Sequence, residues 1–324
     1  PKGLGMYVIT GGAGFIGSNV IRGLNGRGIN DILIVDCLKD GQKIFNLSDL
    51  DVVDFVSIDD FGLMLDQARP LDGVKAVFHQ GANSSTTEWD GALMMRQNFT
   101  FSKKLLSRCH DDGIPLIYAS SASVYGNNTR FAEQRCNENP INAYAYSKFL
   151  FDCHMRHYLD QWTASSQVVG LRYFNVFGPY EQHKAGMASV VYHFNQQAQN
   201  DGEISVFGAS HGYDDGEHER DFIHVDDVVK ANLWFLDHPD VSGIFNIGTG
   251  MARSFNDIAN QVRQWHTARG KPVWINYIDM PASLQPAYQA FTRADISSLR
   301  SVGYDEAFTD LETGVNAYLD FLNP

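Results

Sequence analysis

The fold follows from one stretch near the N-terminus, Val8-Ile-Thr-Gly-Gly-Ala-Gly-Phe-Ile-Gly-Ser18. Its glycines Gly11, Gly14 and Gly17 have the spacing that turns a strand into a helix and lets the backbone approach a pyrophosphate. Asp36 ends the next apolar run, 19 residues after Gly17 (36 − 17), where a carboxylate can accept hydrogen bonds from a ribose diol. A glycine turn alone is weak evidence, but in this context it predicts a dinucleotide-binding site.

The residues around Asp36 leave the choice between NAD and NADP open. Asp36 by itself favours NAD, whereas Lys39 and Lys43 can hold a 2′-phosphate and favour NADP. Surface lysines are usually just solvated, so the bare sequence does not decide between the two cofactors.

Short apolar runs alternate with amphipathic stretches through the first half of the chain, which is typical of a parallel sheet with helices on both faces. The predicted strands are Met6–Thr10, Asp31–Asp36, Ala76–His79, Pro115–Ala119 and Gln167–Phe174. The predicted helices are Asn19–Leu24, Phe99–Arg108 and Ala143–Leu159.

The pattern changes after Gly178-Pro179. Here we expect three helices: Ala188–Gln199, one that begins at a capping box of Ser254 and Asp257, and Ala307–Leu322. We expect strands at Phe222–His224 and Ile244–Ile247, and a surface loop at His211–Glu219. The predicted fold is an α/β doubly wound parallel sheet of Rossmann type with a smaller C-terminal substrate lobe. We assign residues 1–175 and 221–252 to the dinucleotide-binding domain and residues 176–220 and 253–324 to the substrate-binding lobe, with ligand in the cleft between them.

Composition excludes several classes of partner. The net charge of −13 argues against a nucleic acid or an anionic membrane, and no apolar run is long enough to span a bilayer. The eleven histidines form no ligand-like cluster, so we expect no metal. Scattered cysteines indicate free thiols and a cytoplasmic protein; they are Cys37, Cys109, Cys136 and Cys153. We expect residues 1–5, ahead of Met6, to be an expression or processing remnant.

Three side chains suggest catalysis of carbinol–ketone chemistry. Tyr144 and Lys148 are four residues apart, so on a helix they share a face, and a nearby ammonium lowers the pKa of a phenol. Ser121 ends a predicted strand, where its hydroxyl can orient a reacting oxygen. Taken separately, a Tyr–Lys pair is more often a solvated helix face and a serine-rich segment is more often an ordinary loop.

The glycine turn, the strand-end serine and the Tyr-x-x-x-Lys pair, in this order, resemble the extended short-chain dehydrogenase/reductase superfamily. The resemblance implies that Tyr144 is the general base and that Ser121 positions the substrate hydroxyl. It also implies that Lys148 binds the nicotinamide ribose and lowers the pKa of Tyr144.

Further segments resemble a narrower family, the ADP-L-glycero-D-manno-heptose 6-epimerases of lipopolysaccharide core heptose biosynthesis. They are Phe78–Gly91, Arg172–Pro179, His183-Lys184, Met187–Ser189, Arg220–Phe222 and Tyr288–Thr292. This resemblance implies an isomerase in which tightly bound NADP takes a hydride from C6″ of the sugar and returns it to the opposite face. It also implies that Lys184 is a second acid/base group, and that the protein is a homo-oligomer such as a pentamer.

The turn and the resemblance together imply two sets of contact residues. The cofactor set is Gly11, Gly14, Phe15, Ile16, Gly17, Asp36, Cys37, Lys43, Gln80, Gly81, Ala82, Asn83, Ser84, Asn98, Lys148, Val176 and Lys184. The substrate set is Asn175, Gly186, His193, Phe207, Gly208, Ala209, Ser210, Arg220 and Tyr288. A planar guanidinium also suits a diphosphate, which favours Arg220 on chemical grounds.

The chain departs from this family's pattern at four places. Cys37 and Ile58 stand where an asparagine and a phosphate-holding lysine are usual, and Gly186 stands where a substrate-contacting serine is expected. The His211–Glu219 loop is longer than usual. Three other readings remain: a UDP-hexose 4-epimerase, a nucleotide-sugar dehydratase and a non-catalytic dinucleotide sensor. Ala122-Ser123 lacks the acid pair that a dehydratase needs.

Overall fold

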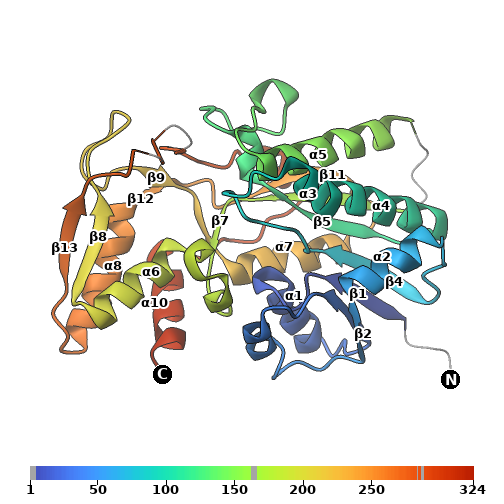
Figure 1. Ribbon diagram of the computed structural model, residues 1–324, viewed down its shortest axis with the longest axis horizontal. Helices are drawn as coiled ribbons and strands as arrows, with labels where there is room; N and C mark the ends of the chain where they lie inside the picture. The colour runs from blue at the N-terminus through green and yellow to red at the C-terminus, as the bar shows by residue number, and fades with distance from the viewer. Residues whose placement is uncertain (1–4, 162–165, 283, 286–287) are drawn as a thin grey trace.

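A seven-stranded parallel sheet forms the larger part of the molecule (Figure 1). The computed structural model describes residues 5–161, 166–282, 284–285 and 288–324, so residues 1–4 of the expected remnant lie outside the described residues. The strand order is β11-β6-β5-β4-β1-β2-β3. All strands are parallel, but the chain adds β2 and β3 on one side of β1 and the later strands, from β4 on, on the other side. The strands are β1 Met6–Thr10, β2 Ile32–Asp36, β3 Asp54–Ser57, β4 Val74–His79, β5 Leu116–Ser121, β6 Val168–Tyr173 and β11 Gly243–Ile247.

Helices cover both faces of this sheet because successive strand residues point to opposite sides. In β1, Val8 belongs to one buried apolar cluster and Ile9 to the other. The Ile9 side is covered by α1 Phe15–Gly26, α7 Val225–Asp237 and α9 Ser297–Ser301. The Val8 side is covered by α2 Ile58–Asp66, α4 Phe101–Asp112 and α5 Ala143–Gln161. The predicted doubly wound α/β fold is confirmed.

The smaller lobe has its own apolar cluster. Its elements are α6 Val190–Asn200, α8 Phe255–Ala268, α10 Leu311–Leu322, and the parallel pair β8 Glu203–Phe207 and β13 Trp274–Ile278. Two short pairs lie between lobe and sheet: β7 Asn175–Phe177 with β10 Phe222–His224, and β9 Glu219–Arg220 with β12 Arg253–Ser254. The predicted capping box is present, since Ser254 and Asp257 cap α8 reciprocally. No helix in the described part of the chain is both long and apolar enough to cross a membrane.

Several predicted elements need correction. The last helix begins at Leu311 instead of Ala307, because Asp310 caps it and the amide of Thr309 bonds to Asp227. The expected surface loop ends one residue early, at the start of β9, and its His218 is buried (1% exposed). The short elements are η1 Gly41–Asn46, α3 Gly91–Met94, the π-helix η2 Met95–Thr100, η3 Ala122–Tyr125, η4 Arg135–Asn137 and η5 Gln182–Met187.

Candidate active site

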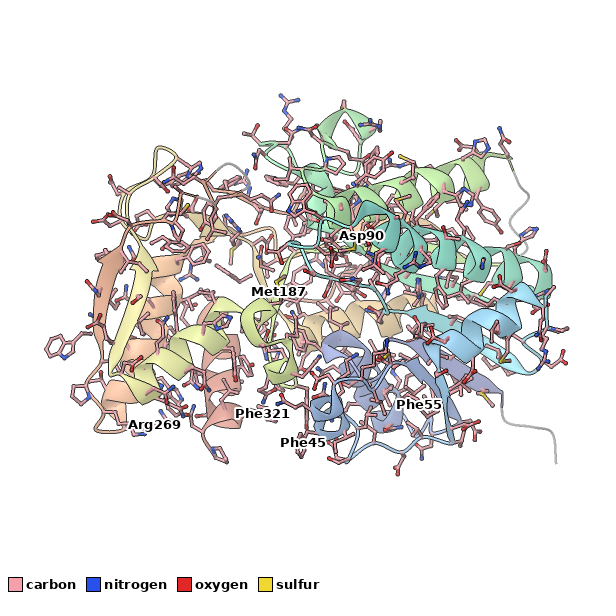
Figure 2. The ribbon with its side chains drawn as sticks, viewed as in Figure 1. Phe45, Phe55, Asp90, Met187, Arg269 and Phe321 are labelled. Carbon is pink, nitrogen blue, oxygen red and sulfur yellow. The ribbon has the colours of Figure 1, made fainter. Side chains whose placement is uncertain are left out.

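A cavity of about 750 Å³ lies at the carboxyl ends of the central strands, where sheet and lobe meet. Met187, on η5, marks this junction in the middle of the molecule (Figure 2). Most of the predicted cofactor and catalytic residues line it, namely Gly11, Gly14, Phe15, Ile16, Gly17, Asp36, Lys43, Gln80–Ser84, Ser121, Tyr144, Lys148, Val176 and Lys184. Asn175, predicted to touch the substrate, lines it too. Sequence reasoning missed Asp40, Ser85, Ala119, Ser120, Tyr173, Phe174, His183, Met187–Val190, Phe222 and Phe255 in the lining.

The glycine turn leaves backbone exposed to the cavity. Gly11 has φ +68°, and a Cβ on it would lie 2.5 Å from the amide nitrogen of Gly81. A Cβ on Gly17 would lie 2.1 Å from the Gly11 carbonyl oxygen. Helix α1 begins after Gly14 with no side-chain cap and no acidic residue in its first turn. Its free N–H groups therefore face the cavity as an anion-binding terminus.

Asp36 and Lys43 form an ion pair at the far end of this region. The Asp36 carboxylate accepts hydrogen bonds from the Ala13 amide (2.8 Å), the Cys37 amide (2.6 Å) and the Lys43 ammonium (2.9 Å). Lys43 comes from η1, whose N-terminus is capped by Asp40. One spot of the lining thus offers both an acceptor for a diol and a cation for a phosphate. Cys37, predicted to touch the cofactor, contributes its amide to Asp36 and does not line the cavity.

Asn98 supports the lining instead of forming it. Its side-chain oxygen accepts a hydrogen bond from the Asn83 amide (2.8 Å), and its nitrogen donates to the Asn83 carbonyl (2.9 Å) and to Ser147 Oγ (3.0 Å). Asn98 is buried and does not line the cavity, so its direct contact with the cofactor stays a prediction. Its amide holds the Gln80–Ser84 segment against α5.

Lys148 does not lower the pKa of Tyr144 as the sequence predicted. The Lys148 ammonium is buried and donates to the Ala119 carbonyl oxygen at 2.8 Å. Burial raises the pKa of Tyr144 above that of a free phenol, against the opposing hydrogen bond with Ser121. Burial lowers the pKa of Lys148 to about 8, although the charge of Asp152 opposes this. Tyr144 and Lys148 share a helix face, as expected, but the ammonium is turned to the strand.

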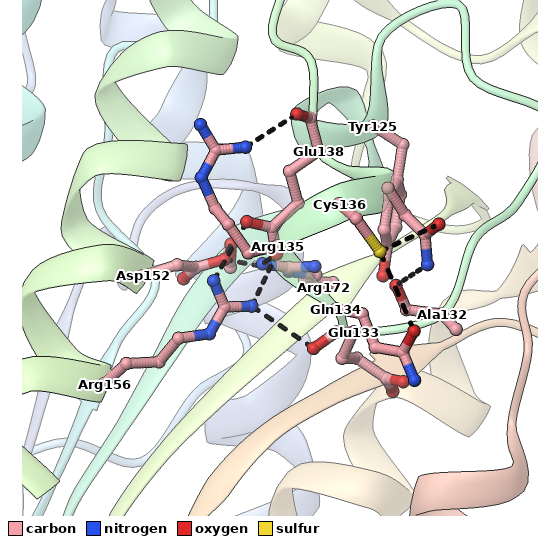
Figure 3. Close-up of polar contacts among 12 residues, drawn as sticks. Tyr125, Ala132, Glu133, Gln134, Arg135, Cys136, Glu138, Asp152, Arg156 and Arg172 are labelled. Carbon is pink, nitrogen blue, oxygen red and sulfur yellow. Dashed lines mark hydrogen bonds and ion pairs between the residues drawn. The ribbon is translucent and has the colours of Figure 1, made fainter. Parts of the chain in front are cut away.

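A buried ion network fixes α5 against β5 and β6 (Figure 3). The Asp152 carboxylate accepts hydrogen bonds from Tyr118 (2.8 Å), Ser120 (2.9 Å) and Arg172 (2.8 Å). Arg172 also pairs with Glu138 at 2.5 Å. Asp152 lies one turn after Lys148, and sequence reasoning missed it; that spacing was the available signal. The network sets where α5 presents Tyr144 and Lys148 to the end of β5.

Lys184 reaches the cavity from the lobe side, on η5. Its ammonium lies 5.2 Å from the centroid of the Phe15 ring. Burial lowers the pKa of Lys184, and the charge of Glu181 opposes this shift. Tyr144 lines the same cavity from α5, so two groups able to transfer protons meet one cavity from two different elements.

Arg220 is a buried cation with an aromatic surround (7% exposed). Its guanidinium carbon lies 4.9 Å from the Tyr288 ring centroid and 5.7 Å from that of Phe255. In the part of the chain that the structure describes, no carboxylate pairs with it, and its guanidinium donates to the Glu219 carbonyl oxygen at 3.1 Å. A buried guanidinium without a counter-ion favours an anionic ligand.

Other predicted substrate residues gather around Tyr288. Its ring lies 6.2 Å from that of Phe207 and 5.3 Å from that of His218, whose Nε2 is 2.8 Å from Ser210 Oγ. Gly208 and Ala209 lie next to Ser210 in the chain. The Gly208 amide donates to the Ile278 carbonyl oxygen, and the Ala209 amide donates to the Asp215 carboxylate.

Phe255, which sequence reasoning missed, lines the cavity and lies beside Arg220, so the cluster adjoins the cavity. His193 lies on α6 beside the Tyr192 ring, and Gly186 is exposed on η5. Neither of these two residues lines the cavity.

Comparison with known proteins finds sugar-nucleotide epimerases in both sequence and structure. Residues 7–248 match the model of the NAD dependent epimerase/dehydratase family. The chain is 53% identical over 315 residues to an ADP-L-glycero-D-manno-heptose-6-epimerase from Alkalilimnicola ehrlichii, covering 97% of each chain. The structure of the Helicobacter pylori ADP-L-glycero-D-manno-heptose-6-epimerase superposes with a TM-score of 0.82 at 30% identity, covering 98% of this chain and 96% of that one. A UDP-glucose 4-epimerase from Thermus thermophilus, in complex with NAD, gives a TM-score of 0.78 at 26% identity, covering 97% and 98%.

Proposed function

Because the chain belongs to the NAD dependent epimerase/dehydratase family, we propose that it is an ADP-L-glycero-D-manno-heptose 6-epimerase. This isomerase inverts C6″ of the ADP-heptose used for the lipopolysaccharide core. The observation that carries the proposal is 53% identity across 97% of both chains to a relative of that name. We also propose that the protein acts as a homo-oligomer, and that its sheet and lobe divide at the boundaries given above, except that α9, which those boundaries assign to the lobe, packs on the sheet.

The residues fit a nicotinamide dinucleotide. At Gly11 and Gly17 a Cβ would collide with backbone, so the glycines allow the tight turn that brings the chain close to a pyrophosphate. The uncapped start of α1 offers free N–H groups to the same pyrophosphate. We favour NADP over NAD, because the Lys43 ammonium neutralises the Asp36 carboxylate that would otherwise repel a 2′-phosphate. A dinucleotide held by these residues would supply the reversible hydride transfer that inversion of C6″ needs.

Inversion at one carbinol requires proton transfer on both faces of the sugar carbon. Tyr144 serves one face from α5, and Lys184 serves the other from η5. Ser121, hydrogen-bonded with Tyr144, orients the reacting oxygen, and Lys148 holds the nicotinamide ribose. The lowered pKa of Lys184 brings it toward the range in which proton transfer is efficient.

The lobe holds the nucleotide part of the substrate. Arg220 supplies the charge for the diphosphate, since it is buried without a carboxylate partner. Phe207, Ser210 and Tyr288 form the surrounding wall.

A UDP-hexose 4-epimerase is the second candidate, supported by the T. thermophilus neighbour at 26% identity. Its identity to this chain is half that of the heptose-epimerase relative, so we rank it lower. A dehydratase would need acidic chemistry at Ala122-Ser123, which the chain lacks.

The test has two steps on the purified protein. Mass spectrometry of the cofactor released on denaturation should find NADP. The protein should then interconvert the two C6″ epimers of ADP-heptose without net reduced cofactor and leave UDP-glucose unchanged. Tyr144→Phe combined with Lys184→Met should abolish turnover. Stoichiometric accumulation of NADPH, or turnover of UDP-glucose alone, would contradict the proposal.

A further inference from the structure

Glu181 is a fully buried carboxylate (0% exposed) with no part in the roles above. Glutamate is almost never buried this completely unless its charge has partners. One carboxylate oxygen accepts a hydrogen bond from the Ser189 amide at 2.7 Å, and the other accepts from Ser189 Oγ at 2.5 Å. The segment between these two residues carries Lys184, so the Glu181–Ser189 contact, here called the clasp, joins both ends of the loop that bears it.

The clasp is reinforced on both sides. The Lys184 amide donates to the Glu181 carbonyl oxygen at 2.9 Å, which fixes the lysine one turn after the carboxylate. Ser189 caps the N-terminus of α6 through the Tyr192 amide, which ties the loop to the lobe. Within the loop Ala185 has φ +46°, a conformation that persists only where the surrounding structure holds it.

The Glu181 carboxylate of the clasp is also the charge that acts on Lys184. Among the described residues Lys184 forms no ion pair within hydrogen-bonding range, and the charge that acts on it is that of Glu181. His183, next to it, feels Lys184 together with Lys43 of η1, Asp40, and Asp36 of β2. The phenol of Tyr318 from α10 acts on Glu181, and Tyr192 from α6 acts in turn on Tyr318. Among the described residues, Glu181 is therefore the carboxylate whose charge raises the pKa of Lys184.

We propose that Glu181 is the positioning residue for Lys184, its carboxylate clasping Ser189 and so holding the Lys184 ammonium at the cavity. The inference rests on the proposed role of Lys184 as the second acid/base group. Glu181 does not line the cavity, so it acts through the loop and its charge.

The decisive variant is Glu181→Gln, which keeps the shape and retains an acceptor for the Ser189 amide but removes the charge. Removing a charge that raises the pKa of Lys184 should lower that pKa further. The Lys184 signal, observed by ¹³C NMR of the reductively dimethylated protein and assigned with Lys184→Met, should titrate at lower pH. The matching limb of the kcat–pH profile should move with it, and kcat at neutral pH should fall at least about tenfold with KM little changed.

Ser189→Ala separates the clasp from the charge. It should lower kcat while leaving the pH of the Lys184 titration nearly unchanged, because the carboxylate remains. Exposed Glu306→Gln is the matched control and should alter neither readout.

The inference is overturned if Glu181→Gln leaves both the Lys184 titration and kcat as in the wild type. A shifted titration in Glu181→Gln with full turnover in Lys184→Met would instead refute the proposed role of Lys184 and leave the clasp standing.

Discussion

Replacing Arg172 by methionine should lower the free energy of unfolding by about 3 kcal/mol, near the lower end of the range for breaking a buried ion pair. The Arg172, Asp152 and Glu138 side chains have no exposed surface, so water cannot replace the lost contacts. Two charge-assisted hydrogen bonds disappear, each worth roughly 1.5–3 kcal/mol. The loss stays near the lower bound because Arg156 still pairs with Glu138, and Tyr118 and Ser120 still donate to Asp152. Methionine fills similar space, so a cavity adds little.

Urea unfolding at saturating cofactor measures this loss, with Arg27→Met as the control. Arg27 pairs with Asp237 on the surface, where both side chains are exposed, and such a pair contributes about 0–1 kcal/mol. A loss in Arg172→Met no larger than that in Arg27→Met would refute the reasoning, because the network would then behave as a surface pair.

The same variant has a pH signature. Burial raises the pKa of Glu138, but the hydrogen bond from Arg156 and the charge of Arg172 outweigh it, so the pKa is lowered overall. A carboxyl whose folded pKa is lowered adds stability above its unfolded value of about 4.3 and loses it as the pH falls through the folded value. Without Arg172 the folded pKa rises, so acid unfolding should begin at a higher pH than in the wild type.

Three further outcomes follow from the site and its supports. Tyr144→Phe should lower kcat by about 10²–10⁴-fold in a steady-state epimerisation assay, whereas Tyr146→Phe, on the exposed side of α5, should stay near wild type. Arg220→Met should weaken ADP binding at least about tenfold by calorimetry, with exposed Arg269→Met unchanged, since a charged hydrogen bond is worth roughly 1.5–3 kcal/mol. Gly126→Ala should lower the melting temperature more than Gly28→Ala: both glycines have positive φ, but only at Gly126 would a Cβ meet backbone, 1.9 Å from the Asn139 oxygen.

Local signals carried much of the fold prediction. The glycine turn, the apolar strands of the sheet and the capping box at Ser254 each depend on residues close in sequence, and the structure has all of them. Strand β3 was missed because Asp54–Ser57 is short and largely exposed, and the pair β8–β13 was missed because its partners lie about 70 residues apart. Helix α7 could have been found, since Asp226 and Asp227 occupy its first turn; its histidine cap hid the start.

In the site, too, the sequence indicates which residues matter better than it indicates which groups they contact. The family resemblance marked Asn98 as a cofactor contact, whereas its hydrogen bonds go to Asn83 and Ser147, which are 15 and 49 residues away. Arg220 was favoured for its guanidinium, but the feature that supports the proposed diphosphate role is its burial without a carboxylate partner among the described residues. No sequence pattern encodes that surrounding.

The Tyr144–Lys148 pair shows why electrostatics escapes such reasoning. Spacing fixes the shared helix face, but the sign of a pKa shift depends on the balance between burial and the direction of the neighbouring charge. In this structure burial raises the pKa of Tyr144, while the Lys148 ammonium, 29 residues from its acceptor, is held by the Ala119 carbonyl. Spacing alone therefore predicts the wrong sign for the pKa shift of Tyr144 in this structure.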